Sequence, residues 1–308
     1  MIFQKMVWSL GLLAGSMASG WWLKRRGILT DARANRLVRW VIKGPAPVVL
    51  CLSFWRMDLR SLSPWLLPIT GFLISAATLL PAFLYSRLDK LNAPQTGSFL
   101  TCAFFSNVGY LGAYTAYALF GEAAYALCVL YMVFFTPCFY TLGFGLAARY
   151  GKKPRGSAAR DALNDELRLY PFLGMLAGVS LSLAGIARPP ILEYVSHALI
   201  NMDTVLDLVA VGSQVILISP RGQLRPCLAM SAIKFLYAPL IAWGLVTLFH
   251  IHGLPRMVVL LEASTPVGVS PLMLPLLFGL DRRLSNALWV FTTILAIPWL
   301  LIMAPLFR

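Results

Sequence analysis

The chain has 308 residues, of which 59% are hydrophobic and only 12% are charged, and its mean hydropathy is +0.75. Soluble globular domains carry about 25% charged residues, so this composition leaves too few charges to cover a water-exposed surface. It excludes a water-soluble fold and predicts an all-α polytopic membrane protein. The net charge of +14 would by itself suit a nucleic-acid partner, but the positions of the charges argue against one.

Apolar runs of about 20 residues, the length that crosses a bilayer as a helix, recur along the whole chain. We expect ten transmembrane helices, at 2–23, 35–55, 64–86, 96–119, 123–148, 170–187, 201–219, 227–249, 256–279 and 284–306. The sixth and seventh runs are the weakest. A polar stretch divides the chain, which predicts a first five-helix unit at 1–148, a cytoplasmic linker at 149–169 and a second five-helix unit at 170–308.

The basic residues alternate with the predicted spans. Most of the 26 lysines and arginines fall between spans 1 and 2, after span 3, in the central linker, and after spans 7 and 9. In a ten-span arrangement all of these places lie on one side, and an excess of Lys and Arg marks the cytoplasmic side. The basic charge therefore reflects topology, with no nucleic acid as partner. We expect both termini to be extracytoplasmic in a bacterial inner (cell) membrane.

Short matches relate the two halves in a common order. "GLLAG" begins at Gly11 and "GMLAG" at Gly174, while "SNVG" ends at Gly109 and "STPVG" at Gly268. Each half holds five predicted spans, and because five is odd the second half enters the membrane from the opposite side. The sequence therefore predicts two inverted five-helix repeats, an architecture that is common among secondary transporters.

The fourth span of each half, helices 4 and 9, is interrupted by polar residues and helix breakers. The interrupted stretches read "CAFFSNVGYLGAYTAY" at 102–117 and "LLEASTPVGVSPLMLP" at 260–275. Pro266 removes a backbone donor, and Gly109, Gly112 and Gly268 permit unwound backbone angles. Within a bilayer, broken helix is tolerated only where protein or a water-filled cavity satisfies the backbone. We therefore expect these two helices to cross near the membrane centre, each unwound at the crossing.

Polar side chains at the two interruptions form the candidate ion-binding site. Its members are Ser106, Asn107, Glu262, Ser264 and Thr265. Together they offer an all-oxygen shell for a hard cation such as Na⁺, centred on Glu262 and Asn107, or else a protonatable site. Carboxylates within membrane spans are uncommon and usually functional. No resident cofactor is expected other than Na⁺ as a coupling ion.

The candidate substrate-binding residues combine unwound backbone with further intramembrane polar groups. They are Asn107, Gly109, Pro266, Gly268, Ser270, Asp207, Gln214 and Lys43. Ser270, directly before a proline, is predicted to be an N-cap that restarts a half-helix. Asp203 lies near the predicted start of span 7, and Asp207 one turn deeper. The ammonium groups of Lys43 and Lys234 either snorkel to the interface or face an anion.

Two stretches resemble the auxin efflux carrier family, part of the bile acid/arsenite/riboflavin transporter superfamily. They read "SNVGYLG…LFGEAAYALCVLYMVFFTPCFYTLGFGLAARY" and "GWWLKRRGILTDARANRLVRWVIKGPAPVVL". The resemblance implies ten helices in two inverted repeats with crossing helices 4 and 9, and transport of small organic anions such as carboxylates or auxin. Ser106, Asn107 and Glu262 are similar to sodium ligands of bile acid symporters. The chain departs from the plant carriers because only its second crossing has a proline, Pro266.

The predicted function is secondary active transport of a small organic anion, carboxylate or auxin-like, coupled to Na⁺ or H⁺, by alternating access around the crossing. A bile-acid-type sodium symporter and a transport-dead receptor stay open as alternatives. A sodium/proton antiporter is disfavoured, because span 5 carries no acid beyond Glu122 at its entrance. The sequence has no P-loop, HExxH or GxSxG motif, so we expect neither a primary pump nor an enzyme. Expected partners are the organic anion and the lipid bilayer, with a homodimer as a further option.

Overall fold

A computed structural model describes residues 2–57, 59, 63–152, 169–213 and 222–303, and regular structure in those ranges is helical apart from one isolated antiparallel bridge. Six helices in this part of the chain are long and apolar enough to cross a membrane. They cover Asp31–Arg56, Pro64–Leu88, Glu122–Tyr150, Ile191–Ser213, Leu224–Leu248 and Arg282–Met303. These helices confirm an all-helical chain with membrane-spanning segments, while the ten-helix inverted repeat stays a prediction.

The chain folds into two compact units, and each unit takes segments from both halves of the sequence. Unit 1 comprises Met1–Trp65, Ala113–Val129 and Asp165–Val215. Unit 2 comprises Leu66–Gly112, Leu130–Asn164 and Ile216–Arg308. The chain passes from unit 2 to unit 1 within span 4, immediately after Gly112. The predicted boundaries at 148 and 170 describe sequence repeats, which is a different division from these compact units.

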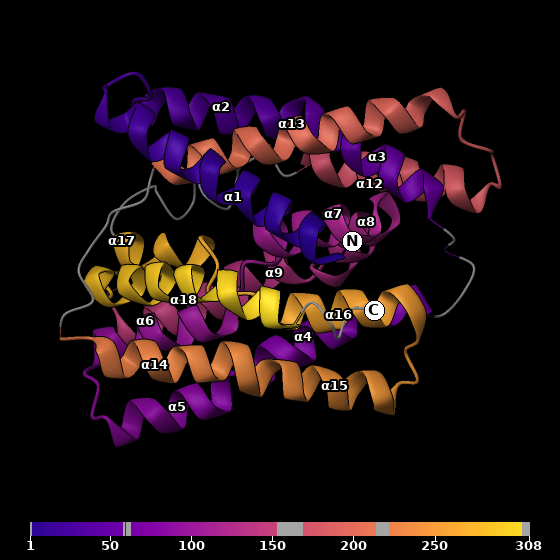
Figure 1. Cartoon of the computed structure of the whole chain (residues 1–308). Coiled ribbons are helices and arrows are strands. Elements are labelled where there is room, and N and C mark those ends of the chain that lie inside the picture. The colour runs from indigo at the N-terminus through magenta and orange to yellow at the C-terminus, as the bar shows by residue number, and fades with distance from the viewer. Residues whose placement is uncertain (1, 58, 60–62, 153–168, 214–221, 304–308) are drawn as a thin grey trace. The chain divides into compact units, whose positions relative to one another are not determined.

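Unit 1 is held together by helices that approach closely at glycines. Its helices are α1 (Ile2–Arg25), α2 (Asp31–Lys43), α3 (Pro45–Arg56), α7 (Ala113–Phe120), most of α8 (Glu122–Tyr131), α12 (Leu169–Leu183) and α13 (Ile191–Ser213). α12 packs along α3, and α1 packs along α13 (Figure 1). A Cβ at Gly178 of α12 would lie 2.9 Å from the Cβ of Phe54 on α3. Small residues allow such close helix contacts, which stabilise helix pairs in membranes.

The predicted start of span 7, at residue 201, is wrong, and its predicted end at 219 lies outside the described residues. The helix α13 begins at Ile191 and ends at Ser213. Its first turns carry Glu193 and His197, which lower the local hydropathy, but both have partners. Arg56 donates to Glu193 at 2.6 Å, and the His197 ring lies 2.6 Å from the Tyr117 hydroxyl. Asp203 therefore lies near the middle of a span and not near its end. Gln214 lies outside the described residues.

Unit 2 holds the interrupted helices and an aromatic core. Its elements are α4 (Leu67–Ala77), α5 (Leu79–Leu88), α6 (Ala93–Phe104), η2 (Val108–Gly112), α9 (Phe135–Cys138), η3 (Phe139–Gly143), α10 (Phe144–Tyr150), α14 (Leu224–Ala232), η5 (Ile233–Tyr237), α15 (Ala238–Leu248), α16 (Gly253–Ala263), η6 (Ser270–Leu272), α17 (Leu274–Phe278) and α18 (Arg282–Met303). The short turn η1 (Ser63–Leu66) lies at the boundary between the units.

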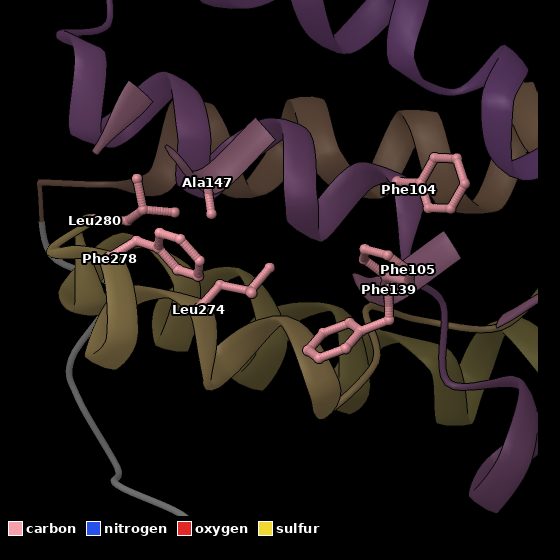
Figure 2. Close-up of a cluster of buried hydrophobic side chains, with 7 residues drawn as sticks. All are labelled: Phe104, Phe105, Phe139, Ala147, Leu274, Phe278 and Leu280. Atoms are coloured by element: carbon pink, nitrogen blue, oxygen red, sulfur yellow. The ribbon is translucent and has the colours of Figure 1, made fainter. Parts of the chain in front are cut away.

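A cluster of buried apolar side chains fixes the end of α6 within unit 2. It consists of Phe104, Phe105, Phe139, Ala147, Leu274, Phe278 and Leu280 (Figure 2). The rings of Phe105 and Phe139 meet edge to face with centroids 5.3 Å apart. Such aromatic pairs contribute about 0.5–1.5 kcal/mol beyond the burial of their surface. Because Phe105 directly follows α6, this packing holds the point at which the helix stops.

Candidate functional site

Both predicted interruptions are present, and within unit 2 they are joined to each other. An isolated antiparallel bridge links Ser106, after the end of α6, to Val267, after the end of α16. Its two hydrogen bonds run from the Asn107 N–H to the Pro266 carbonyl at 2.8 Å and from the Gly268 N–H to the Phe105 carbonyl at 2.9 Å. Each unwound segment therefore satisfies backbone groups of the other, as a bilayer interior requires. We call this pair of segments, 105–112 and 262–270, the crossing.

Asn107 holds the first interruption at the point where the helix resumes. Its carbonyl accepts a hydrogen bond from the Gly112 N–H at 3.0 Å, which closes the π-helical turn η2. Its side-chain oxygen accepts from the Leu111 N–H at 3.4 Å. The candidate ligand Asn107 is thus also a structural residue of the crossing.

The second interruption resumes differently from the prediction, because Ser270 is not an N-cap. The 3₁₀ turn η6 already includes Ser270, its cap residue is Val269, and no side chain caps it. The Leu272 N–H donates to the carbonyl of Val269 at 3.0 Å. A backbone carbonyl therefore closes this turn, so the serine hydroxyl is not needed for it.

Glu262 extends from the second interruption to the first. It belongs to the last turn of α16 and is completely buried. A Cβ added to Gly112 would lie 2.6 Å from the Glu262 carboxyl carbon and would clash with its oxygens. A side chain at position 112 would therefore displace this carboxylate from its present position. The sequence placed Gly112 among the glycines that permit the interruption, but the predicted site residues did not include it.

Lys234, one of the two lysines that the sequence leaves to snorkel or to face an anion, contacts the crossing. It lies in η5 and is completely buried. Its ammonium donates to the carbonyl of Ala103 at 2.6 Å and to the hydroxyl of Ser106 at 2.7 Å. The C-terminal end of a helix carries partial negative charge and favours a cation, and Ala103 lies in the last turn of α6. Lys234 therefore compensates the electrostatics of the broken helix end.

The position of Lys234 affects whether a sodium ion can bind at Ser106. A Na⁺ ion on the Ser106 hydroxyl would lie beside the ammonium of Lys234, which would repel it, and the sodium shell stays a prediction. The hydroxyls of Ser264 and Thr265 donate to carbonyls within their own segment, at 2.8 and 2.7 Å. Among the described residues, no group of three or more His, Cys, Asp or Glu side chains is placed to hold a metal ion.

The other substrate-site candidates divide between the two units. Gly268 belongs to the crossing, because a Cβ there would lie 2.8 Å from the Ser106 carbonyl oxygen, whereas the same atom at Gly109 would meet the Met132 sulfur at an ordinary 3.6 Å. Lys43 is exposed in unit 1, with its ammonium 5.7 Å from the centre of the Tyr170 ring. Asp207 also belongs to unit 1, on α13. The structure thus gathers the predicted serine, threonine, asparagine, glutamate, proline and glycine residues in unit 2.

Comparisons with known proteins agree on a transporter. A family described as "Membrane transport protein" matches residues 13–161 and 160–304. A protein of Methanothermobacter thermautotrophicus is 26% identical over 282 residues, which is 90% of each chain. A protein of Methanocaldococcus jannaschii is 26% identical over 286 residues, or 89% of this chain and 90% of that protein. Both relatives carry the name uncharacterized transporter.

These matches confirm the resemblance to the auxin efflux carrier family and agree with the apolar helices in placing the chain in a membrane. They also indicate a transporter and not an enzyme. The chain belongs to the membrane transport protein family.

Proposed function

We propose that the protein is a secondary active transporter of a small organic anion, of the carboxylate or auxin-like class, which works by alternating access around the crossing. The observation that carries this proposal is the buried ammonium of Lys234 at the end of α6. A buried charge is costly unless it is compensated. In the described part of the chain no ion pair joins Lys234 to a carboxylate, so an anionic substrate would supply the missing negative charge.

The backbone of the crossing supports the same chemistry. Helical backbone resumes at Val108, just after Asn107, and a helix start carries partial positive charge that favours anions. Discontinuous helices of this kind supply substrate sites in many secondary transporters. A carboxylate at the crossing would therefore meet positive potential from both the helix start and Lys234.

Of the two coupling ions, the geometry favours H⁺ over Na⁺. The hydroxyl of Ser106 already accepts a hydrogen bond from the Lys234 ammonium, which would repel a sodium ion placed there. The distribution of basic residues supports a cell-membrane location with both termini extracytoplasmic. The crossing is complete within one chain, so a homodimer would not be needed to build it.

Ligand-induced thermal stabilisation of the purified protein tests this proposal. The wild type is screened against mono- and dicarboxylates, short and aromatic, with sodium or choline as the counter-ion. We expect stabilisation by one class of carboxylate in either salt, and its loss in Lys234→Met. Lys90→Met is the matched control, because Lys90 is an exposed lysine of unit 2 and is not among the candidate site residues. If Lys234→Met binds the anion as tightly as the wild type, the lysine is not part of the site.

Uptake into proteoliposomes then separates a transporter from a receptor. We expect accumulation of the stabilising anion when a pH gradient is imposed, and the same accumulation when choline replaces sodium. Accumulation that requires sodium would favour the bile-acid-type symporter. Binding without accumulation under any gradient would contradict transport and favour the receptor.

A further inference from the structure

Two aspartates lie in the middle of a membrane span of unit 1, away from the interrupted helices. They are Asp203 and Asp207 on α13, which runs unbroken from Ile191 to Ser213. At 1.5 Å per residue this helix is about 35 Å long, so Asp203 lies near its centre and Asp207 one turn further on. Asp203 is only 7% exposed, and Asp207 is partly buried. Ionisable residues at this depth are rare and usually serve a function.

Neither aspartate has a countercharge among the described residues. No ion pair includes Asp203 or Asp207, and the buried Oδ1 atom of Asp203 has no hydrogen-bond partner. A buried carboxylate without a partner is strongly disfavoured as an anion. Residues four apart on a helix face each other, and two like charges there repel. A proton on one of the two carboxyl groups removes the repulsion and the burial penalty of that group.

The charged groups on neighbouring helices are engaged elsewhere or lie on exposed surface. α13 packs against α1, α2 and α3. The charged residues described on those helices are Lys24 and Arg25 on α1, Asp31, Arg33, Arg36, Arg39 and Lys43 on α2, and Arg56 on α3; the titratable groups are Cys51 on α3 and, on α7, Tyr114 and Tyr117. Lys24 pairs with Asp31, Arg56 pairs with Glu193 and lies 3.6 Å from Glu122, and Arg25 lies over the Trp21 ring. Arg33, Arg36, Arg39 and Lys43 are exposed.

Another face of α13 carries polar groups that have partners of their own. His197 lies 3.8 Å from Glu193 and 2.6 Å from the hydroxyl of Tyr117. One turn further, Asn201 accepts a hydrogen bond from the hydroxyl of Tyr114 at 3.0 Å. Asn201 is exposed and stands two residues before Asp203. Asn201 and Asp203 are two residues apart, so their side chains point to nearly opposite faces of α13 and this polar face does not contact the aspartates. Asp207 is the member of the pair that is only partly buried.

We propose that Asp203 and Asp207 form a proton-binding site in unit 1, separate from Glu262 at the crossing. The reaction is the reversible transfer of one H⁺ from water to a carboxylate oxygen, which turns a buried anion into a neutral acid. Glu262 is less suited to this exchange, because it is completely buried against Gly112. The proposal rests on the proposed function for its role, since this proton would be the one that moves with the organic anion.

Infrared spectroscopy of the full-length protein in lipid nanodiscs tests the site without knowledge of the substrate. Protonated carboxyl groups give a C=O stretching band that carboxylates lack. We expect the wild type to show this band at pH 7, and Asp203→Asn and Asp207→Asn to lose most of it. Asp31→Asn is the matched control, because Asp31 is exposed and paired with Lys24. A band that survives both asparagine variants, or that only Glu262→Gln removes, overturns the proposal.

A second pair of variants distinguishes loss of the proton site from misfolding of the asparagine variants. Asp203→Glu and Asp207→Glu keep the acid and change its position, so each should shift the band without removing it. Proton uptake is then followed with a pH dye in proteoliposomes. A protonated pair with no anion transport would contradict the proposed function and leave the proton site standing. Anion transport with undiminished proton uptake in both asparagine variants would contradict the site and leave the function standing.

Discussion

Two buried glutamates, one in each unit, show what different surroundings make of the same side chain. Glu122 of unit 1 is held by both guanidinium nitrogens of Arg188, at 2.6 and 2.9 Å, and by the hydroxyl of Ser196. Glu262 of unit 2 lies at a break in its helix, against the backbone of Gly112. Glu122, Arg188 and Ser196 form a closed, charge-compensated group within unit 1, which we call the clamp. Glu262, in contrast, lies at the end of α16, where the helix is interrupted. Burial alone therefore does not identify a functional carboxylate.

The largest expected effect is on the clamp. Removing one partner of a buried ion pair strands the other charge, which typically costs about 3–5 kcal/mol. Arg188→Ala should lower the free energy of unfolding by about that amount, because Arg188 and Glu122 are both nearly inaccessible to solvent. Thermal unfolding in detergent measures the loss. A double replacement with apolar residues, Glu122→Leu with Arg188→Met, should be less destabilising than Arg188→Ala. Equal stability of Arg188→Ala and wild type would refute the clamp.

The complementary expectation concerns Glu262. Glu262→Gln should reduce anion transport at least tenfold, equivalent to about 1.4 kcal/mol, and should leave the free energy of unfolding nearly unchanged. The reason is that glutamine keeps the shape beside Gly112 and removes the charge. Glu122→Gln should behave in the opposite way, with lost stability. Transport and unfolding are measured on the same preparations. If Glu262→Gln and Glu122→Gln lose transport and stability to the same extent, the two glutamates do not have different roles.

A smaller effect is expected from one methyl group at the crossing. Gly112→Ala should lower anion affinity or transport several-fold, because the added Cβ would displace the Glu262 carboxylate. Gly109→Ala is the matched control, since the same atom there makes only an ordinary contact with Met132. Both variants are compared by ligand-induced thermal stabilisation and by uptake. Equal behaviour of the two alanine variants would show that the close approach of Gly112 and Glu262 has no bearing on function.

The sequence could predict the interruptions but not their partners. Pro266, Gly109 and Asn107 within apolar runs break helices by local chemistry, so the crossing was predictable from neighbouring residues. The contact of Lys234 with Ser106, by contrast, joins residues far apart in the chain, and no local pattern encodes it. The start of α13 was missed for a related reason. Glu193 lowers local hydropathy, and its compensation by Arg56 is visible only in three dimensions.

The smallest expected effect on the free energy of unfolding comes from Arg56, the exposed arginine beside the clamp. Arg56 lies 3.6 Å from Glu122 and 2.6 Å from Glu193, but its side chain is 44% exposed, against 7% for Arg188. Exposed ion pairs contribute about 0–1 kcal/mol, because water and salt screen them. Arg56→Ala should therefore change the free energy of unfolding by less than about 1 kcal/mol, and less still in high salt. A loss as large as that of Arg188→Ala would mean that Glu122 needs both arginines, and that the clamp extends to the exposed start of α13.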